Sequence, residues 1–417
     1  MKENKYFWTS IGLYMNYFVQ GIQAIIIAQN INIFAERWGT DKAGVMGVIA
    51  VTGIGKVLIL LFSGVLSDKF GRKPLIYVGM IGYIAFFGGL LFNTSLTLAY
   101  VIAFIAGAAT SFLDGATYPA LMEIYPDNPS SASVVVKGFI STSGMLLPMF
   151  IGWLNGNNIW YGWSLVIPMV IVVINSISLL KAKFPDQELR ELKAKGVKVD
   201  SKVTNKVKNN ITFKEQPKYM VEGVILMLYA FCCMSTFYLF QQVITLYGVE
   251  VIGMSEIASR ALLSYYTAGS FIAVLLSSII MSKGIRDMAI LVIYGAVSSV
   301  AIVTMYLFPS QAILTVGSFT IGFTVAGGVL QTGNAMLSQF FPEGKGKNTS
   351  IYNVFMSLAT YVMPTIASKM MKVDFTQVML LDAGVAVGGF VLMLILSIRY
   401  SKVFGIKNIF SKVVKEN

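Results

Sequence analysis

The chain has 417 residues, of which 56% are hydrophobic and only 12% are charged. Soluble domains carry about one quarter charged residues, so the composition excludes an ordinary soluble domain and indicates a polytopic membrane protein. The formal net charge of +12 would suit nucleic-acid binding, but the placement of the basic residues along the chain excludes that class of partner.

Twelve apolar runs are long enough to cross a bilayer, which takes about 20 helical residues. In chain order they cover residues 7–34, 44–66, 74–94, 97–124, 131–155, 158–181, 219–248, 256–281, 288–308, 310–341, 349–371 and 375–399. The sequence therefore predicts an all-α membrane protein with twelve transmembrane helices.

The basic residues predict the orientation of these helices. With the N-terminus inside, 25 of the 32 Lys and Arg residues lie on the cytoplasmic side, which is the asymmetry of the positive-inside rule. Four lie outside (Arg37, Lys42, Lys369 and Lys372) and three within spans (Lys56, Lys137 and Arg260). We therefore expect a plasma-membrane protein with both termini cytoplasmic and with basic segments that contact anionic lipids.

One long polar segment divides the twelve runs six and six. It is rich in Lys and covers residues 182–218, so we interpret it as a cytoplasmic linker between bundles at 1–181 and 219–400, with a basic tail at 401–417. Sliding the halves by 216 positions places Pro126 on Pro342 and Pro148 on Pro364. Such internal repeats are typical of transporters.

Enzyme chemistry and cofactors are not expected. The chain has no histidine, and its two cysteines, Cys232 and Cys233, are adjacent within an apolar run, which suits packing better than a disulfide or a metal site. Paired catalytic carboxylates or an activated nucleophile are not visible either. We expect a monomer without metal or cofactor.

A charged, glycine-punctuated loop joins the second and third runs. It reads Gly64-Val-Leu-Ser-Asp68-Lys-Phe-Gly71-Arg72-Lys73, in which glycines permit a sharp reversal and Asp68 can pair with the basic residues. The loop resembles the signature G-x-L-x-D-R-x-G-R-K of the major facilitator superfamily. That resemblance implies two six-helix bundles, a central site lined by helices 1, 4, 7 and 10, and alternating access.

The end of helix 4 carries a second resemblance to facilitator permeases. Tyr118, Glu123 and Pro126 look like the family's Y-x-x-E-x-x-P run, without the Arg that normally follows. By family analogy Glu123 lies near Arg72 and Lys73 and completes an ion cluster at the inner gate. The alternative is a solvated helix end.

Polar residues recur at helical spacing on three of the cavity helices. We predict that they bind substrate, the alternative being hydrogen bonds that join helices. The substrate-binding candidates on these stripes are Asn16, Gln20 and Gln23 in helix 1, Tyr238 and Gln241 in helix 7, and Gln331 and Asn334 in helix 10.

Two charges lie near mid-membrane, Lys56 in helix 2 and Asp114 in helix 4. Charges at that depth are costly and mark transport pathways. We predict that Asp114 senses protons and that Lys56 attracts an anionic group of the substrate; a permanent structural pair is the alternative. We expect Lys137 to snorkel to the cytoplasmic face, and Arg260 either to steer anions or to lie among headgroups.

The predicted function is secondary transport of a small hydrophilic solute, either a hydroxylated organic acid of the quinate or shikimate type or a sugar. Helix 5 carries Gly144, Pro148 and Gly152 where the superfamily's drug/proton antiporters have G-P-x-x-G-G, which favours proton-coupled import. The alternatives are a multidrug efflux antiporter and, more remotely, a transporter-derived membrane sensor.

Overall fold

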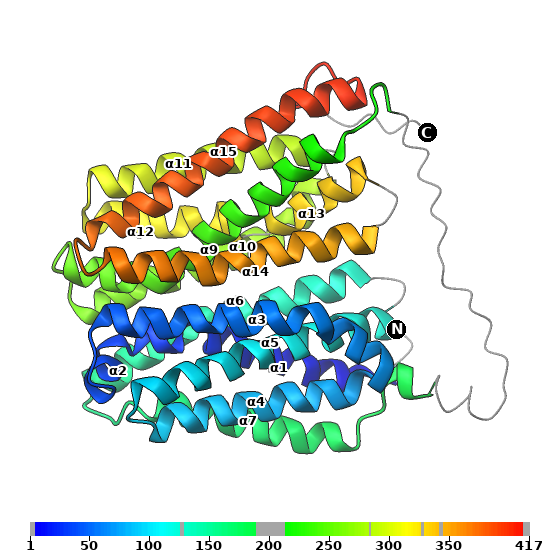
Figure 1. The fold of residues 1–417 in the computed structure, drawn as a ribbon. Coiled ribbons are helices and arrows are strands. Elements are labelled where there is room, and N and C mark those ends of the chain that lie inside the picture. Colours follow the sequence, from blue (N-terminus) through cyan, green and yellow to red (C-terminus); the bar gives the residue numbers. More distant parts are fainter. Residues whose placement is uncertain are drawn as a thin grey trace.

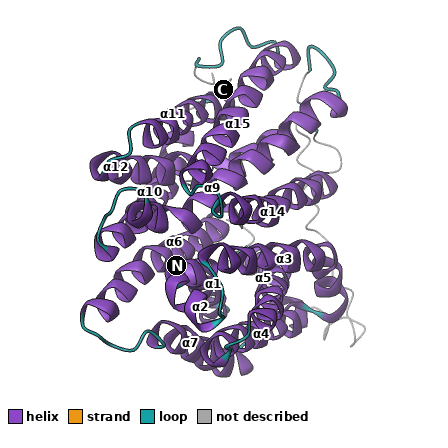
Figure 2. Cartoon of the chain, turned by 60° about the vertical axis from the view of Figure 1, so that its left-hand side comes forward, coloured by secondary structure: helices purple, strands orange, loops and turns teal. Residues whose placement is uncertain are grey.

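The computed structural model describes residues 5–125, 129–188, 213–282, 285–326, 329–341 and 345–411. Every regular element in these ranges is helical, because a chain within hydrocarbon must satisfy its own backbone hydrogen bonds. The helices form two bundles, and in Figure 1 the first bundle lies below the second. Figure 2 shows the same chain turned by 60° about the vertical axis. Pro126, Pro342 and most of the linker lie outside the described residues.

The first bundle contains six long helices and one short one. They are α1 (Phe7–Gln29), α2 (Ile31–Arg37), α3 (Lys42–Phe70), α4 (Arg72–Phe92), α5 (Leu96–Ile124), α6 (Pro129–Gly156) and α7 (Trp163–Leu180). The predicted run at 7–34 is thus two helices, separated at Asn30, whose side chain donates a 3.1 Å hydrogen bond back to the Ile26 carbonyl.

The second bundle follows with six spans, two of which contain a π-helical turn. They are η1 (Tyr219–Gly223) with α9 (Val224–Glu250), α10 (Glu256–Ser282), α11 (Asp287–Leu307), α12 (Gln311–Ile321) with η2 (Gly322–Ala326) and α13 (Val329–Phe340), α14 (Lys345–Met370) and α15 (Thr376–Phe404). The tenth span is therefore interrupted where a single helix was predicted, and such π turns often mark functional positions.

Within the described residues, nine helices meet the length and apolarity expected of membrane spans. The remaining three spans are α10, α14 and the interrupted α12–η2–α13. Helices α10 and α14 pack against α6 and α3 of the other bundle, and buried polar side chains join helices there. The twelve-helix prediction agrees with this architecture.

Small residues set the contact between the bundles. A Cβ on Gly53 of α3 would lie 2.5 Å from the Tyr361 backbone nitrogen of α14, so only glycine permits this approach. Gly144 of α6 lies similarly close to Thr267 of α10. These crossings hold the two bundles together at the interface across which a rocking motion would occur.

Candidate functional site

An ion pair lies near the middle of the first bundle. Lys56 Nζ of α3 is 3.4 Å from Asp114 Oδ2 of α5, and their side chains keep 26% and 17% of their accessible surface. Tyr17 of α1 donates a 2.9 Å hydrogen bond to Asp114 Oδ1. The pairing that the sequence left open is thus present, with a second donor on the carboxylate and with access to solvent.

Two glycines allow α3 and α5 to bring these charges together. A Cβ on Gly107 would lie 1.9 Å from the Thr52 carbonyl, and one on Gly55 would lie 2.2 Å from the Phe104 carbonyl. Ser111 adds a 2.7 Å hydrogen bond from its hydroxyl to the carbonyl of Lys56 itself. The depth of the pair is therefore set by close backbone packing rather than by the charges alone.

Two buried tyrosines and one half-buried tyrosine surround Asp114, and sequence reasoning did not place any of them against it. Tyr17, Tyr83 and Tyr118 each interact electrostatically with the carboxylate. Tyr83 is linked through the Thr110 hydroxyl (3.0 Å) to Gln23 Oε1 (3.3 Å). The spacing of Tyr118, one helical turn after Asp114 on the same face, was the signal that could have revealed one of them.

Lys137 does not snorkel to the cytoplasmic face, so that prediction is wrong. Its half-buried ammonium interacts electrostatically with Lys56 of α3 and with Cys233 of α9. The face of α6 on which it lies is turned toward the second bundle, as the contacts of Ser141 and Gly144 with α10 show.

The polar stripes divide into residues that join helices and residues that keep unused hydrogen-bonding capacity. Asn16 accepts a 2.8 Å hydrogen bond from Asn175 of α7, and Asn334 accepts one of 3.1 Å from Thr349 of α14. These contacts favour the interhelical role for Asn334, whereas Asn16 also keeps Nδ2 without a partner among the described residues. Tyr238 shares a 3.3 Å hydrogen bond with Thr52 across the bundle interface.

Two glutamines differ from this pattern. Gln20 Oε1 has no hydrogen-bond partner among the described residues. Gln241 bonds only to the carbonyl one turn earlier, at 3.3 Å. Both side chains therefore keep hydrogen-bonding groups that are not used between helices of the described structure. Gln331 lies in α13, but its side chain is outside what the structure describes.

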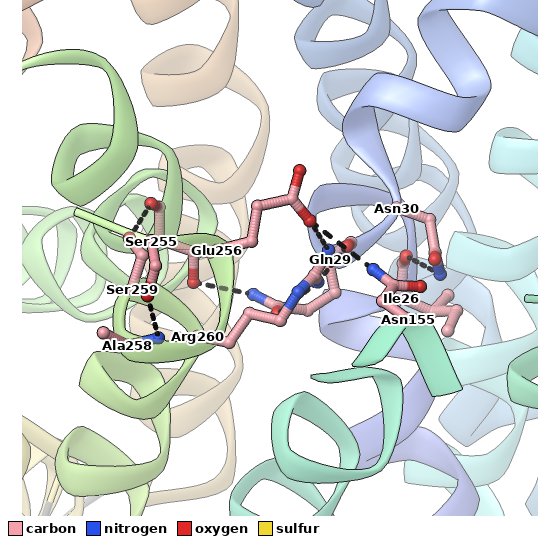
Figure 3. A network of polar contacts seen from close by, with 10 residues as sticks. Ile26, Gln29, Asn30, Asn155, Ser255, Glu256, Ala258, Ser259 and Arg260 are labelled. Carbon is pink, nitrogen blue, oxygen red and sulfur yellow. Dashed lines mark hydrogen bonds and ion pairs between the residues drawn. The ribbon is translucent and has the colours of Figure 1, made fainter. Parts of the chain in front are cut away.

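A polar network joins the two bundles at the end that the charge distribution assigns to the outside (Figure 3). Arg260 of α10 is 7% exposed and donates to the Gln29 carbonyl of α1 and, at 3.3 Å, to Gln29 Oε1. Glu256 accepts from Arg260 at 3.4 Å and from Asn155 of α6 at 3.5 Å. Arg260 is thus buried between the bundles and does not lie among headgroups.

Further bonds extend this outer network. Gln29 donates to the Thr245 hydroxyl at 3.0 Å, and Lys42 forms an ion pair with Glu250. Ser368 donates to the Ala43 carbonyl at 2.6 Å. A cavity of about 270 Å³ beside Arg260 is lined by residues of α1, α2, α6, α9 and α10. The described hydrogen bonds between the bundles thus gather in the half that the charge distribution assigns to the outside.

The signature loop forms an ion cluster at the opposite end. Arg72 donates to Asp68 Oδ1 at 2.6 Å, to Glu123 Oε1 at 3.1 Å and to the Ser67 hydroxyl at 2.8 Å. Asp68 keeps 71% of its side-chain surface exposed. Gly71, between α3 and α4, has a φ of 102°. Residues with a Cβ rarely adopt this backbone conformation, so glycine suits the sharp turn between the two helices.

Two residues of the loop differ from expectation. Lys73 donates to the carbonyls of Leu180 and Ala182, at 2.8 and 2.9 Å, so it satisfies the unpaired end of α7 rather than the carboxylates. A Cβ on Gly64 would meet no atom within 4 Å, so no close contact in this conformation requires glycine there.

The last helix is expected to be peripheral from the resemblance to the superfamily, so Asp382 of α15 is not among the predicted site residues, yet it is fully buried. Neither of its oxygens meets a partner in good hydrogen-bond geometry among the described residues. Thr236 of α9 and Tyr266 of α10 lie within electrostatic reach of the carboxyl group. A buried carboxyl at this depth is costly, so it belongs with the residues that need a functional test.

The comparisons with known proteins agree with this architecture. Residues 9–358 match the model of the Major Facilitator Superfamily. The chain is 38% identical over 400 residues to "Inner membrane transport protein YdiM" of Escherichia coli (strain K12), covering 96% of each chain. It is 24% identical over 186 residues to "4-hydroxybenzoate transporter PcaK" of Acinetobacter baylyi, covering 41% of this chain and 39% of that one.

Solved structures show the same fold at low identity. The crystal structure of D-xylose-proton symporter superposes with a TM-score of 0.74 at 12% identity, over 93% of this chain and 97% of that one. With a matching family model, a close full-length relative and two six-helix bundles, the chain belongs to the Major Facilitator Superfamily and is a multi-pass membrane transporter of small solutes.

Proposed function

We propose that this transporter imports a small hydroxylated organic acid together with a proton, by alternating access at the Lys56–Asp114 pair. The observation that carries the proposal is the pair itself, a solvent-accessible carboxylate and ammonium 3.4 Å apart near mid-membrane. Charges at that depth mark transport pathways, and an acid of the quinate, shikimate or hydroxybenzoate type supplies both a carboxylate and hydroxyl groups.

The pair supports coupling of proton and solute because each of its charges stabilises the other. Protonation of Asp114 leaves Lys56 without its counter-ion, and a carboxylate of the substrate then replaces it. Tyr17, which donates to Asp114 Oδ1 at 2.9 Å, holds the carboxyl group in place in either state. Proton and organic anion thus bind together more readily than either binds alone.

The polar networks at the two ends of the molecule support alternating access. The outer network around Arg260 and Gln29 separates the pair from the outside in this conformation. Opening requires those bonds to break. The inner cluster of Arg72, Asp68 and Glu123 joins α3, α4 and α5 at the other end of the first bundle in this same conformation. Both termini and the linker are assigned to the cytoplasm on the positive-inside rule.

A neutral sugar is the second candidate. The amide groups of Gln20 and Gln241, which are not used up by hydrogen bonds to other helices, favour a hydroxyl-rich solute. A sugar would not need Lys56, so charge is the property that separates the two candidates.

Uptake into proteoliposomes with an imposed proton gradient tests the proposal. The panel contains shikimate, quinate, 4-hydroxybenzoate, D-xylose and a cationic dye as an efflux substrate. We expect at least one organic acid to accumulate with the gradient and to equilibrate without it. Gradient-driven movement of the sugar or the dye alone would contradict the proposal.

A further inference from the structure

Lys137 is a charge within a membrane span that the proposed transport cycle does not yet use. It lies on α6 and is half-buried, and no ion pair or hydrogen bond of its ammonium is found among the described residues. Its electrostatic neighbours are the ammonium of Lys56 and the thiol of Cys233. A cation in a membrane span beside a like charge is doubly unfavourable, so a compensating anion is missing.

Neighbours on the same face of α6 show where Lys137 points. Ser141, one turn later, shares a 3.3 Å hydrogen bond with Ser270 of α10, and a Cβ on Gly144, two turns later, would lie 2.9 Å from Thr267 of α10. Residues at these spacings share one helix face. Lys137 therefore lies one helical turn before the Ser141–Ser270 contact, on the face of α6 that meets α10.

The charges around this position do not balance. Asp114 is the one carboxylate that the described structure places against Lys56. The other buried or half-buried carboxylates of the first bundle lie elsewhere, since Glu123 pairs with Arg72 and Asp186 accepts from the Arg72 backbone. In the second bundle Glu222 pairs with Arg399, and Asp382 lies against α9 and α10. Two ammonium groups thus face one carboxylate, which leaves one positive charge without a partner.

We propose that Lys137 is the second counter-ion of the substrate, so that a substrate carboxylate binds between the ammonium groups of Lys137 and Lys56. The proposal rests on the organic-acid function proposed above and deepens it by naming a second residue that receives the carboxylate. A neutral solute leaves the excess positive charge in place, so binding requires a carboxylate. Lysine suits this role because its ammonium has three donors on a flexible stem.

A carboxylate bound at Lys137 would also affect the contact between the two bundles. A substrate held at Lys137 lies directly inside the Ser141–Ser270 contact, at the α6–α10 crossing. Binding would therefore neutralise charge at the point where the two bundles separate or close, which connects occupancy of the site to the rocking motion.

Ligand-dependent thermal unfolding of the purified protein tests this inference without requiring transport. The probes are shikimate and 4-hydroxybenzoate as monocarboxylates, 4-hydroxybenzamide as an uncharged counterpart, succinate as a dicarboxylate, and D-xylose. The variants are Lys137→Met, which keeps length and loses charge, and Lys137→Arg, which keeps charge. Lys369→Met is the matched control, because Lys369 is exposed at the outer end of α14.

We expect the wild type and Lys369→Met to be stabilised by a carboxylate probe and not by 4-hydroxybenzamide. Lys137→Met should weaken the apparent Kd at least tenfold, and Lys137→Arg should stay within about threefold of the wild type. Without ligand, Lys137→Met should unfold at the same or a higher temperature, because it removes a charge within a membrane span that has no partner among the described residues. Lys137→Gln replaces it if the methionine variant does not fold.

The outcomes separate this inference from the proposed function. Unchanged monocarboxylate binding by Lys137→Met would overturn the role of Lys137 and leave the organic-acid function standing. Stabilisation by D-xylose alone, or by none of the acids, would overturn both.

Discussion

Replacing Asp114 by Asn should abolish concentrative uptake while leaving exchange of the solute intact. The substitution keeps the shape of the side chain and an acceptor oxygen for Tyr17, which donates to Oδ1 at 2.9 Å. It removes the negative charge 3.4 Å from Lys56 Nζ. At an effective dielectric constant of about 20, two unit charges at that separation attract by about 5 kcal/mol before desolvation, and partial exposure of both groups reduces the net value.

The gradient fixes the size of the expected loss. One proton moved with one monocarboxylate is electroneutral, so only the pH difference drives uptake, and each pH unit is worth about 1.4 kcal/mol or a tenfold concentration ratio. With about two units imposed, the wild type can accumulate solute up to about 100-fold, whereas Asp114→Asn should reach a ratio of about 1. Because Lys56 then lacks its counter-ion, the KM for the anion should fall.

Gradient-driven uptake and gradient-free counterflow in proteoliposomes measure the two activities separately. The control is Asp374→Asn, which changes a carboxylate in the outer turn that bonds to Thr376. The double variant Asp114→Asn with Lys56→Met reports whether an unpaired ammonium alone causes a defect. Accumulation by Asp114→Asn at the wild-type ratio would refute the coupling role.

Three further predictions concern the two ends of the molecule and its stability. Arg260→Met removes the bonds to Gln29 and should raise the rate at which an impermeant thiol reagent labels a Thr245→Cys variant at least threefold; an unchanged rate would contradict the outer-gate role. Asp68→Asn should lower the transport rate at least tenfold and leave ligand binding within about twofold, whereas lost binding in a folded protein would place Asp68 in the substrate path. Glu222→Gln, which breaks the pair between buried Glu222 and partly exposed Arg399, should cost about 2 kcal/mol of stability, less than the loss of a fully buried pair because water screens Arg399. Glu215→Gln is its exposed control and should cost under about 1 kcal/mol.

The twelve spans and the two bundles were predictable because hydrocarbon imposes one length and one composition on every crossing helix. The two breaks were not. At Asn30 the side chain caps the preceding turn, and at Gly322–Ala326 the helix loosens into a π turn. Neither interrupts the apolar run, so a pattern of hydrophobicity does not reveal them.

The contacts of the candidate site were predictable where they depend on how deep a residue lies in the membrane. They were not predictable where they depend on which face of a helix carries the residue. Lys56 and Asp114 occupy matching depths, and the structure pairs them. Lys137 was misplaced because its position near the inner end of α6 allows snorkelling, whereas its neighbours Ser141 and Gly144 turn that face toward α10.

Asp382 was underrated for the same kind of reason. The expected peripheral place of its helix did not show which face of α15 meets α9. Lys73 bonds to backbone carbonyls at the end of α7. The loop motif did not predict this contact because it gives no information on the backbone of a distant helix.

Simultaneous recording of proton and solute movement in proteoliposomes tests the central claim most directly. A monocarboxylate added outside wild-type vesicles should carry about one proton inward per molecule, and Asp114→Asn should take up the anion in exchange without any accompanying proton. Solute uptake by the wild type without proton movement, or proton movement that persists unchanged in Asp114→Asn, would contradict the account.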